Sequence, residues 1–225
     1  MTSPGIDHLR QEQAAARARY IIEHYITEHP NGVLHQHLQD ERLTSEQAYV
    51  LLKEISRDPK TGLSRADLLS MTLGYELERA AETQQPLTVA VFDLDYFRKV
   101  NEQLTHVGAD RILKQVGEIL HEQIRTSDDV LQAEEMHDVV RWGGEEFVVI
   151  FPNTTIVAGA IAAERIRRAV HDLSVPSKLT HGSISISGGL AAAQTGDSWE
   201  TILQRADAQV LRAKERGRNQ ICFPQ

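Results

Sequence analysis

The chain has 225 residues, of which 41% are hydrophobic and 25% charged, a mixture typical of globular proteins and not of disordered ones. Its formal net charge of −8 disfavours nucleic acid as a partner, because proteins that bind a duplex present a basic face. No apolar run approaches the ~20 residues that span a bilayer, and the polar N-terminus lacks a signal-peptide core. The single cysteine, Cys222, excludes an internal disulfide framework. We therefore expect a cytoplasmic protein without membrane contact.

Residues 1–57 predict a small helical segment that precedes the main domain. Apolar side chains recur there at helical spacing, at Ala18, Ile21, Ile22, Tyr25 and Ile26. Pro30 and Gly32 predict the end of that helix, and Thr44 or Ser45 would cap a second one. The apolar stripe suits either a contact between two copies of the chain or packing on the same chain. We expect a regulatory or dimerising role for this segment.

Histidines are concentrated in the same segment, which holds five of the ten: His8, His24, His29, His35 and His37. Such a cluster raises the possibility of a metal sensor, but its spacing matches no firm ligand pattern. Solvated or capping histidines are the alternative. We leave metal binding by these residues open.

From residue 58 to residue 225 helical and strand patterns alternate, which predicts one α/β domain. The expected helices cover residues 68–82, 112–124, 156–170 and 199–214. The expected strands cover residues 87–93, 139–142, 147–151, 183–191 and 220–223. We predict a central, mostly antiparallel sheet flanked by helices.

Two acidic clusters border the two most apolar strands. Asp93, Leu94 and Asp95 end the first, and Glu145 and Glu146 follow a Gly-Gly turn just before the second. If these strands are neighbours, their carboxylates converge at one edge of the sheet. Clustered carboxylates raise one another's pKa unless a cation lies between them, and hard oxygen ligands suit Mg²⁺. The alternative is a solvated acidic turn.

The stretch RWGGEEF at residues 141–147 resembles the signature of the GGDEF domain, the diguanylate cyclase family, in its GGEEF form. Five further stretches resemble motifs of that family in the same order along the chain: DPKTGL at 58–63, FDLDYFRKVN at 92–101, HVGADRIL at 106–113, AERIR at 163–167, and the residues around 206–219. The resemblance begins at Asp58 and continues to the end of the chain. It implies the nucleotidyl-cyclase type of α/β fold.

The resemblance implies an enzyme that condenses two GTP molecules into cyclic di-GMP and releases two pyrophosphates. Asp93, the carbonyl of Leu94 and Glu145 match the metal ligands, and Glu146 lies beside them. Asp93, Glu145 and Glu146 are the expected catalytic residues, with two Mg²⁺ (or Mn²⁺) ions per site. Such ions neutralise the triphosphate and stabilise the leaving pyrophosphate. Whether Glu145 also accepts the proton of the attacking hydroxyl stays open.

The same resemblance assigns substrate contacts. The backbone at Phe97 and Arg98 would donate to the β- and γ-phosphates, and Lys214 and Arg218, four residues apart on one expected helical face, could reach them too. The alternative for that pair is capping of a helix end.

Asn101 and Asp110 match the guanine-reading pair of the family, and His106 and Leu113 match the same motif. A carboxylate can accept hydrogen bonds from guanine N1–H and N2–H₂, and an asparagine can both donate and accept. Asp110 therefore favours GTP over ATP. For an isolated Asn or Asp near a helix start, helix capping is the alternative.

A possible inhibitory site for cyclic di-GMP is suggested by Arg125 and Asp128, which match the R-x-x-D spelling of the family. The family often places this pattern five residues before the signature, where this chain has Glu134 and His137. About nine extra residues, roughly 129–137, indicate an insertion at the hairpin entrance. A coincidental surface pair is the alternative.

These observations predict an active diguanylate cyclase of bacterial type. Because each site holds one GTP, the phosphodiester forms only between two facing domains, and we expect a homodimer. The alternative is a catalytically silent module that binds GTP or cyclic di-GMP and signals through partners. A related cyclase with mixed products is disfavoured by Asp110.

Overall fold

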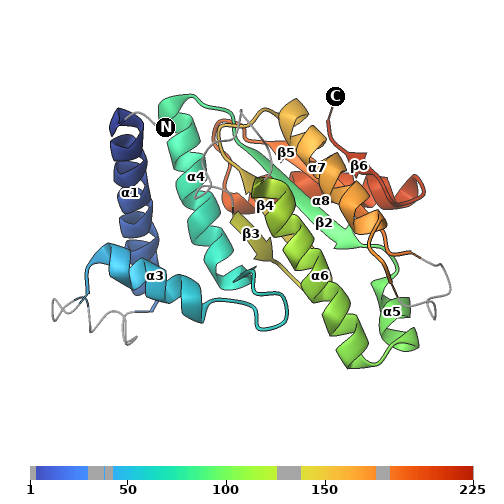
Figure 1. The fold of residues 1–225 in the computed structure, drawn as a ribbon. Coiled ribbons are helices and arrows are strands. Elements are labelled where there is room, and N and C mark those ends of the chain that lie inside the picture. Colours follow the sequence, from blue (N-terminus) through green and yellow to red (C-terminus); the bar gives the residue numbers. More distant parts are fainter. Residues whose placement is uncertain (1–3, 30–37, 39–42, 126–137, 176–182, 225) are drawn as a thin grey trace.

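The computed structural model describes residues 4–29, 38, 43–125, 138–175 and 183–224 (Figure 1). Its helices are α1 (Pro4–Glu28), α3 (Ser45–Ile55), η1 (Ala66–Leu68), α4 (Leu69–Thr83), α5 (Phe97–Gln103), α6 (His106–Arg125), α7 (Ile156–His171) and α8 (Trp199–Glu215). Its strands are β1 (Ser64–Arg65), β2 (Thr88–Leu94), β3 (Asp138–Arg141), β4 (Glu146–Phe151), β5 (Ile186–Ala192) and β6 (Ile221–Cys222). The expected helices and strands are confirmed, and β1 and α5 are additions too short for a periodicity signal.

The strands form one sheet in the order β1-β3-β4-β2-β5-β6. The central strand β2 is antiparallel to both β4 and β5, and β3 is antiparallel to β4. Only the two short edge strands run parallel to their neighbours, β1 to β3 and β6 to β5. The prediction of a mostly antiparallel sheet flanked by helices is confirmed.

Helices cover both faces of this sheet, with α6 and α7 on one face and α4 and α8 on the other (Figure 1). Alternate residues of β2 contribute to the two cores: Ala90 and Phe92 pack with α6 and α7, whereas Val89 and Val91 pack with α4 and α8. Burial on both faces explains why this strand is apolar almost without interruption.

Strand β5 contributes a glycine where a helix approaches the sheet most closely. A Cβ atom on Gly189 would collide with the backbone of α8 at Ala206 and Val210. Glycine therefore lets α8 lie against β5, and this contact fixes the position of the last turns of α8 beside the end of β2.

The N-terminal helices α1 and α3 pack on each other and on α4 (Figure 1). Ile21 and Ile22 of α1 are buried with Leu52 of α3 and with Leu68 and Met71 of the main domain. Thr44 caps α3 as expected, through a capping box with Gln47. Of the two uses considered for the apolar stripe of α1, packing on the same chain is the one that the structure shows.

A buried group of charges joins α1 to the domain. Arg17 of α1 contacts Asp138 at the start of β3, and its Nε lies 3.5 Å from Oε1 of Glu76 in α4. Arg79 adds a second contact to Glu76, at 3.0 Å. All four side chains are mostly buried, so they tie α1, α4 and β3 together away from solvent.

Two of the N-terminal histidines are engaged within α1 and at its end. The rings of His24 and His29 stack on Tyr20 and Tyr25, one turn earlier, with centroids 4.0 and 4.3 Å apart. Each ring also hydrogen-bonds the backbone carbonyl of its tyrosine. His35 and His37 lie outside the described residues.

Over the residues that are described, no helix combines the length and the apolarity that a membrane crossing requires.

Candidate active site

The two acidic clusters meet at one end of the sheet, as predicted. Asp93 at the end of β2 pairs directly with Glu146 at the start of β4. One residue further along, the N–H of Leu94 donates to the carbonyl of Glu145 at 3.2 Å. The hairpin between β3 and β4 closes through hydrogen bonds from the N–H groups of Trp142 and Gly143 to the carbonyl of Glu146. Asp93, Glu145 and Glu146 therefore lie on neighbouring strands beside the same turn.

Burial and mutual repulsion shape the electrostatics of this cluster. Burial raises the pKa of Asp93, although Lys214 opposes the shift with its Nζ 2.6 Å from Oδ2 of Asp93. The pKa values of Glu145 and Glu146 are also raised, first by burial and then by the charge of Asp93. Asp207 of α8 raises the pKa values of Asp93 and Glu146 further. One lysine thus faces several carboxylates.

Asp207 is a member of the cluster that the sequence analysis noted only as part of a motif. It lies seven residues before Lys214 on α8, which is two helical turns, so the two residues lie on one side of the helix. The seven-residue spacing of Asp207 and Lys214 is the sequence signal that could have identified Asp207 as a member of the cluster.

A divalent cation fits this cluster in the kind and charge of its donors. Carboxylate and carbonyl oxygens are the ligands of Mg²⁺, and a cation would relieve the repulsion that raises the carboxylate pKa values. Among the described residues no three acidic, histidine or cysteine side chains already form a closed metal cage. The amine of Lys214 contacts Oδ2 of Asp93 in this arrangement.

Asp95, two residues beyond Asp93, has a different role. Its Oδ2 accepts hydrogen bonds from the Ser185 hydroxyl at 2.7 Å and from the Asn219 N–H at 3.0 Å. Its Oδ1 accepts from the Ser187 hydroxyl at 2.7 Å. Asp95 is 5% exposed, and it joins the end of β2 to β5 and to the turn after α8. Although Asp95 is part of the acidic sequence stretch, both of its carboxylate oxygens already accept hydrogen bonds within the protein.

The predicted phosphate contacts gather beside this turn. Helix α5 begins at Phe97, directly after Tyr96, whose φ of 56° lets the chain turn from strand to helix. Phe97 is buried in the core, whereas Arg98 points to solvent and pairs with Glu102. The first N–H groups of α5 therefore lie next to the carboxylate cluster.

Lys214 and Arg218 both reach this region, but not from one helical face as we expected. Helix α8 ends at Glu215, and Gly217 and Arg218 have φ values of 113° and 67°, which break the helix. Arg218 then stacks its guanidinium 4.5 Å from the ring centroid of Tyr96, and its Nη1 reaches the Lys214 carbonyl at 3.4 Å. Arg218 thus contacts a carbonyl at the end of α8 and also lies beside the predicted phosphate contacts.

The predicted base-reading residues lie on α5 and α6, which are in contact. Asn101 and His106 are exposed, and Asp110 is half-buried. Leu113 is 3% exposed in the core, so the structure gives it a packing role, and its contact with substrate stays a prediction. Oδ1 of Asp110 lies 2.7 Å from Nζ of Lys60, a contact that sequence analysis missed.

A single arginine connects the turn at residues 58–63 to the acidic hairpin. Arg141 donates from Nη1 to both carboxylate oxygens of Asp58, at 2.9 and 3.0 Å, and from Nη2 to the Gly144 carbonyl at 2.7 Å. The pKa of Asp58 is raised by burial, but hydrogen bonds from Arg141 and Thr61 outweigh that effect and hold it below its usual value. This brace fixes the hairpin that carries Glu145.

The possible inhibitory pair is only partly visible. Arg125 is the last residue of α6, and Asp128 and the insertion at 129–137 lie outside the described residues. The inhibitory site stays a prediction.

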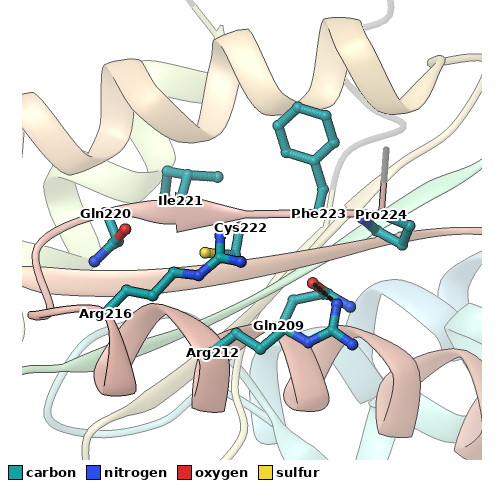
Figure 2. Close-up of a pocket in the computed structure, with 8 residues that line it drawn as sticks. All are labelled: Gln209, Arg212, Arg216, Gln220, Ile221, Cys222, Phe223 and Pro224. Atoms are coloured by element: carbon teal, nitrogen blue, oxygen red, sulfur yellow. Dashed lines mark hydrogen bonds between the residues drawn. The ribbon is translucent and has the colours of Figure 1, made fainter.

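A separate cavity of about 370 Å³ lies between the end of α8 and the edge strand β6 (Figure 2). The residues that line it are Gln209, Arg212, Arg216, Gln220, Ile221, Cys222, Phe223 and Pro224. Figure 2 shows the two arginines rising from the α8 side toward β6. None of the clustered carboxylates takes part in it, so this cavity is not the active site.

Comparisons with known proteins agree with this geometry. The family model described as "Diguanylate cyclase, GGDEF domain" matches residues 55–220. The chain is 30% identical over 212 residues to diguanylate cyclase DgcP of Pseudomonas aeruginosa, covering 94% of this chain and 29% of that protein. It is 34% identical over 169 residues to the response regulator PleD of Caulobacter vibrioides, covering 73% and 35%. The chain thus spans about a third of these curated relatives.

A solved structure extends the likeness to the N-terminal helices. The diguanylate cyclase SiaD of Pseudomonas aeruginosa, solved in complex with its activator SiaC, has a TM-score of 0.71 and 28% identity. That match covers 98% of this chain and 80% of SiaD. The family model covers well over half of the chain, and the matched range includes the acidic site described above. This chain belongs to the GGDEF diguanylate cyclase family.

Proposed function

We propose that this chain is an active diguanylate cyclase, which joins two GTP molecules into cyclic di-GMP and releases two pyrophosphates. The convergence of Asp93, Glu145 and Glu146 with Lys214 at one end of the sheet is the observation that carries the proposal. A silent nucleotide-binding module would not need three carboxylates with raised pKa values at one turn. The intact acidic hairpin therefore favours catalysis over mere binding.

The residues present fit two divalent ions, Mg²⁺ or Mn²⁺, with Asp93, Glu145 and the Leu94 carbonyl as ligands and Glu146 beside them. When bound, the metal would supply charge neutralisation at the α-phosphate and at the leaving pyrophosphate. Lys214 would leave Asp93 and turn to a phosphate oxygen, which its flexible side chain allows. Arg218, held over Tyr96 beside the start of α5, would contact the same phosphates.

At the other end of the nucleotide, Asn101 and Asp110 would bind guanine. Each chain holds one GTP in this arrangement, so the 3′-hydroxyl of one must attack the α-phosphate held by a second chain. We therefore propose a homodimer as the active form, located in the cytoplasm, where GTP is available. Light scattering of the purified chain with and without GTP would test the dimer.

We also propose that residues 1–57 regulate the domain formed by residues 58–225. Arg17 contacts Asp138, which begins β3, and β3 leads within four residues to Trp142 at the acidic turn. A movement of α1 would therefore act on the hairpin through a buried ion pair. SiaD, which resembles this chain over nearly its full length, was solved with an activator, so a protein activator is one input to test.

The decisive experiment is incubation of the purified full chain with Mg²⁺ and GTP, with ATP, or with both, followed by identification of the products by mass. We expect cyclic di-GMP from GTP alone and none from the Glu145→Gln variant. Glu118→Gln, a change of the same kind on the exposed surface of α6, serves as the control and should retain activity. A dimer that binds GTP but forms no cyclic di-GMP would establish the silent module instead.

A further inference from the structure

The residue that contacts the expected guanine ligand Asp110 comes from outside both helices of the base site. Nζ of Lys60 lies 2.7 Å from Oδ1 of Asp110, with side chains 48% and 38% exposed. Lys60 stands at the third position of the DPKTGL stretch, where the resembling family motif D-x-L-T-G-L has leucine. Lys60 therefore departs from that motif.

The backbone around Lys60 is firmly positioned. Oδ1 of Asp58 accepts hydrogen bonds from the N–H groups of Lys60 and Thr61 and from the Thr61 hydroxyl, at 3.2, 2.9 and 2.8 Å. The turn is closed by a hydrogen bond of 2.8 Å from the Gly62 N–H to the Asp58 carbonyl. Arg141 holds the same carboxylate from the hairpin side. Lys60 thus extends from a rigid turn and not from a loose loop.

This turn packs on the face of α6 that carries Asp110. A Cβ atom on Gly117 would come within 3.1 Å of the Thr61 Cβ, so glycine allows the turn to lie directly on the helix. Gly117 is seven residues after Asp110, two helical turns along the same face. Lys60 therefore approaches Asp110 from a surface whose position is set by backbone packing.

A lysine beside an aspartate matches the edge of guanine. Guanine presents O6, an acceptor, next to N1–H and N2–H₂, which are donors. The Asp110 carboxylate can accept from N1–H and N2–H₂, while the ammonium of Lys60, which only donates, can bond O6. Adenine carries an amino group in place of O6, so the ammonium would face a donor. Asp110 and Lys60 side by side can therefore distinguish guanine from adenine at two adjacent positions of the ring, N1 and the 6-substituent.

The existing ion pair does not prevent this use. An ion pair with both partners this exposed contributes little to stability, so a base can rearrange it at little cost. The ammonium also offsets the negative charge of Asp110 that a bound base would cover.

We infer that Lys60 is a specificity-determining residue of the base site, which donates to the 6-oxo group of a purine while Asp110 accepts from its N1–H and N2–H₂. The inference rests on the proposed function in that it takes the space beside Asp110 as the base site. It adds a second, cationic reader to that site and assigns it the 6-position of the base.

Equilibrium binding of nucleoside diphosphates, which cannot release pyrophosphate, tests the inference apart from turnover. The probes are GDP, IDP, the diphosphate of 2,6-diaminopurine riboside, and ADP, each with Mg²⁺. Replacing Lys60 by Met should weaken GDP and IDP about tenfold, the effect of one charge-assisted hydrogen bond. Binding of the two 6-amino probes should stay within about twofold. Lys114→Met, on the same helix as Asp110, is the matched control and should change none of the four.

Other outcomes overturn the inference. Tighter GDP binding by the Lys60→Met variant would show that Lys60 blocks Asp110 and does not read the base. Equal weakening of all four probes would assign Lys60 to the phosphates or to folding, and no change would remove it from the site. Failure of the wild-type chain to bind GDP would also overturn it. A wild-type chain that binds GDP but forms no cyclic di-GMP would overturn the proposed function alone.

Discussion

Two charge clusters lie near opposite ends of the β3–β4 hairpin, and their balance differs. Near α1, Arg17 and Arg79 face Glu76 and Asp138, two cations for two acids. At the end of β2, the described residues show Lys214 paired with Asp93 in a cluster of four acids that also contains Glu145, Glu146 and the exposed Asp207. Both clusters are at least partly withdrawn from water, where uncompensated charge is costly.

The difference separates a structural cluster from a functional one. In the balanced cluster each acid has an arginine beside it, and the cluster joins α1 to the domain. The unbalanced cluster keeps several carboxylates at raised pKa, a state that a divalent cation would relieve. A protein tolerates such an excess where a ligand supplies the missing charge. Two of the following four substitutions change one residue of each cluster, and the other two change a nearby carboxylate whose hydrogen bonds are already made.

The largest effect is expected from Asp93→Asn. Removing a metal ligand should lower the rate of cyclic di-GMP formation by about 1,000-fold, which equals ~4 kcal/mol of transition-state stabilisation. The metal-free protein should not lose thermal stability, because the change also removes repulsion from the cluster. Product formation and thermal unfolding without metal would be measured together. Asp67→Asn, on the exposed surface, is the control; a destabilised Asp93→Asn protein would contradict the functional reading.

Arg17→Met should have the next largest effect, this time on folding. It leaves Asp138 and Glu76 buried with one cation fewer, which typically costs about 3–4 kcal/mol. Urea unfolding should report this as a lower free energy of unfolding. Arg19→Met removes the same group two residues away on an exposed position and should change the value by less than about 0.5 kcal/mol. Equal effects of the two variants would refute the balanced cluster.

Asp95→Asn should separate the two aspartates of β2. An amide in place of the Asp95 carboxylate leaves the Asn219 N–H or a serine hydroxyl without its acceptor, at a cost of about 2 kcal/mol. The same substitution thus destabilises at residue 95 and not at residue 93. Comparing the two variants by urea unfolding without metal gives the result directly, and similar curves would argue against distinct roles.

The smallest effect is expected from Asp58→Asn, which removes the carboxylate that Arg141 holds and changes how the free energy of unfolding depends on pH. Because its folded pKa lies below the ordinary 3.8, Asp58 stabilises the fold above that pH and loses the contribution as pH falls through the folded value. Asp58→Asn should cost about 1 kcal/mol at pH 7. The difference from wild type should shrink below pH 4, as followed by urea unfolding. A difference that is constant across this range would remove the ionised form from the explanation.

The sheet and its acidic end could be predicted from the sequence because they depend on strong local patterns. The apolar run before Asp93 and the Gly-Gly turn before Glu145 each identify a strand end, and antiparallel pairing brings both together. The helix cap at Thr44 follows the same kind of local rule.

The parts that sequence analysis missed depend on contacts between distant segments. Lys60 and Asp110 are fifty residues apart, and nothing local to either indicates the other. The four-residue spacing predicts that Arg218 shares a helical face with Lys214, yet α8 ends at Glu215 and three residues with positive φ, Gly217, Arg218 and Asn219, follow it. Asp95 belongs to the same acidic stretch as Asp93, and its own role depends on Ser185 and Ser187, which are distant in the sequence.

The two outermost strands, β1 and β6, contain two residues each. A long exposed strand edge is a template on which further copies of a protein can add, producing open-ended aggregates. Here each edge offers too little backbone for such growth. A homodimer must bind a second copy of the chain without adding a third. The short edge strands favour such a closed dimer over open-ended assembly.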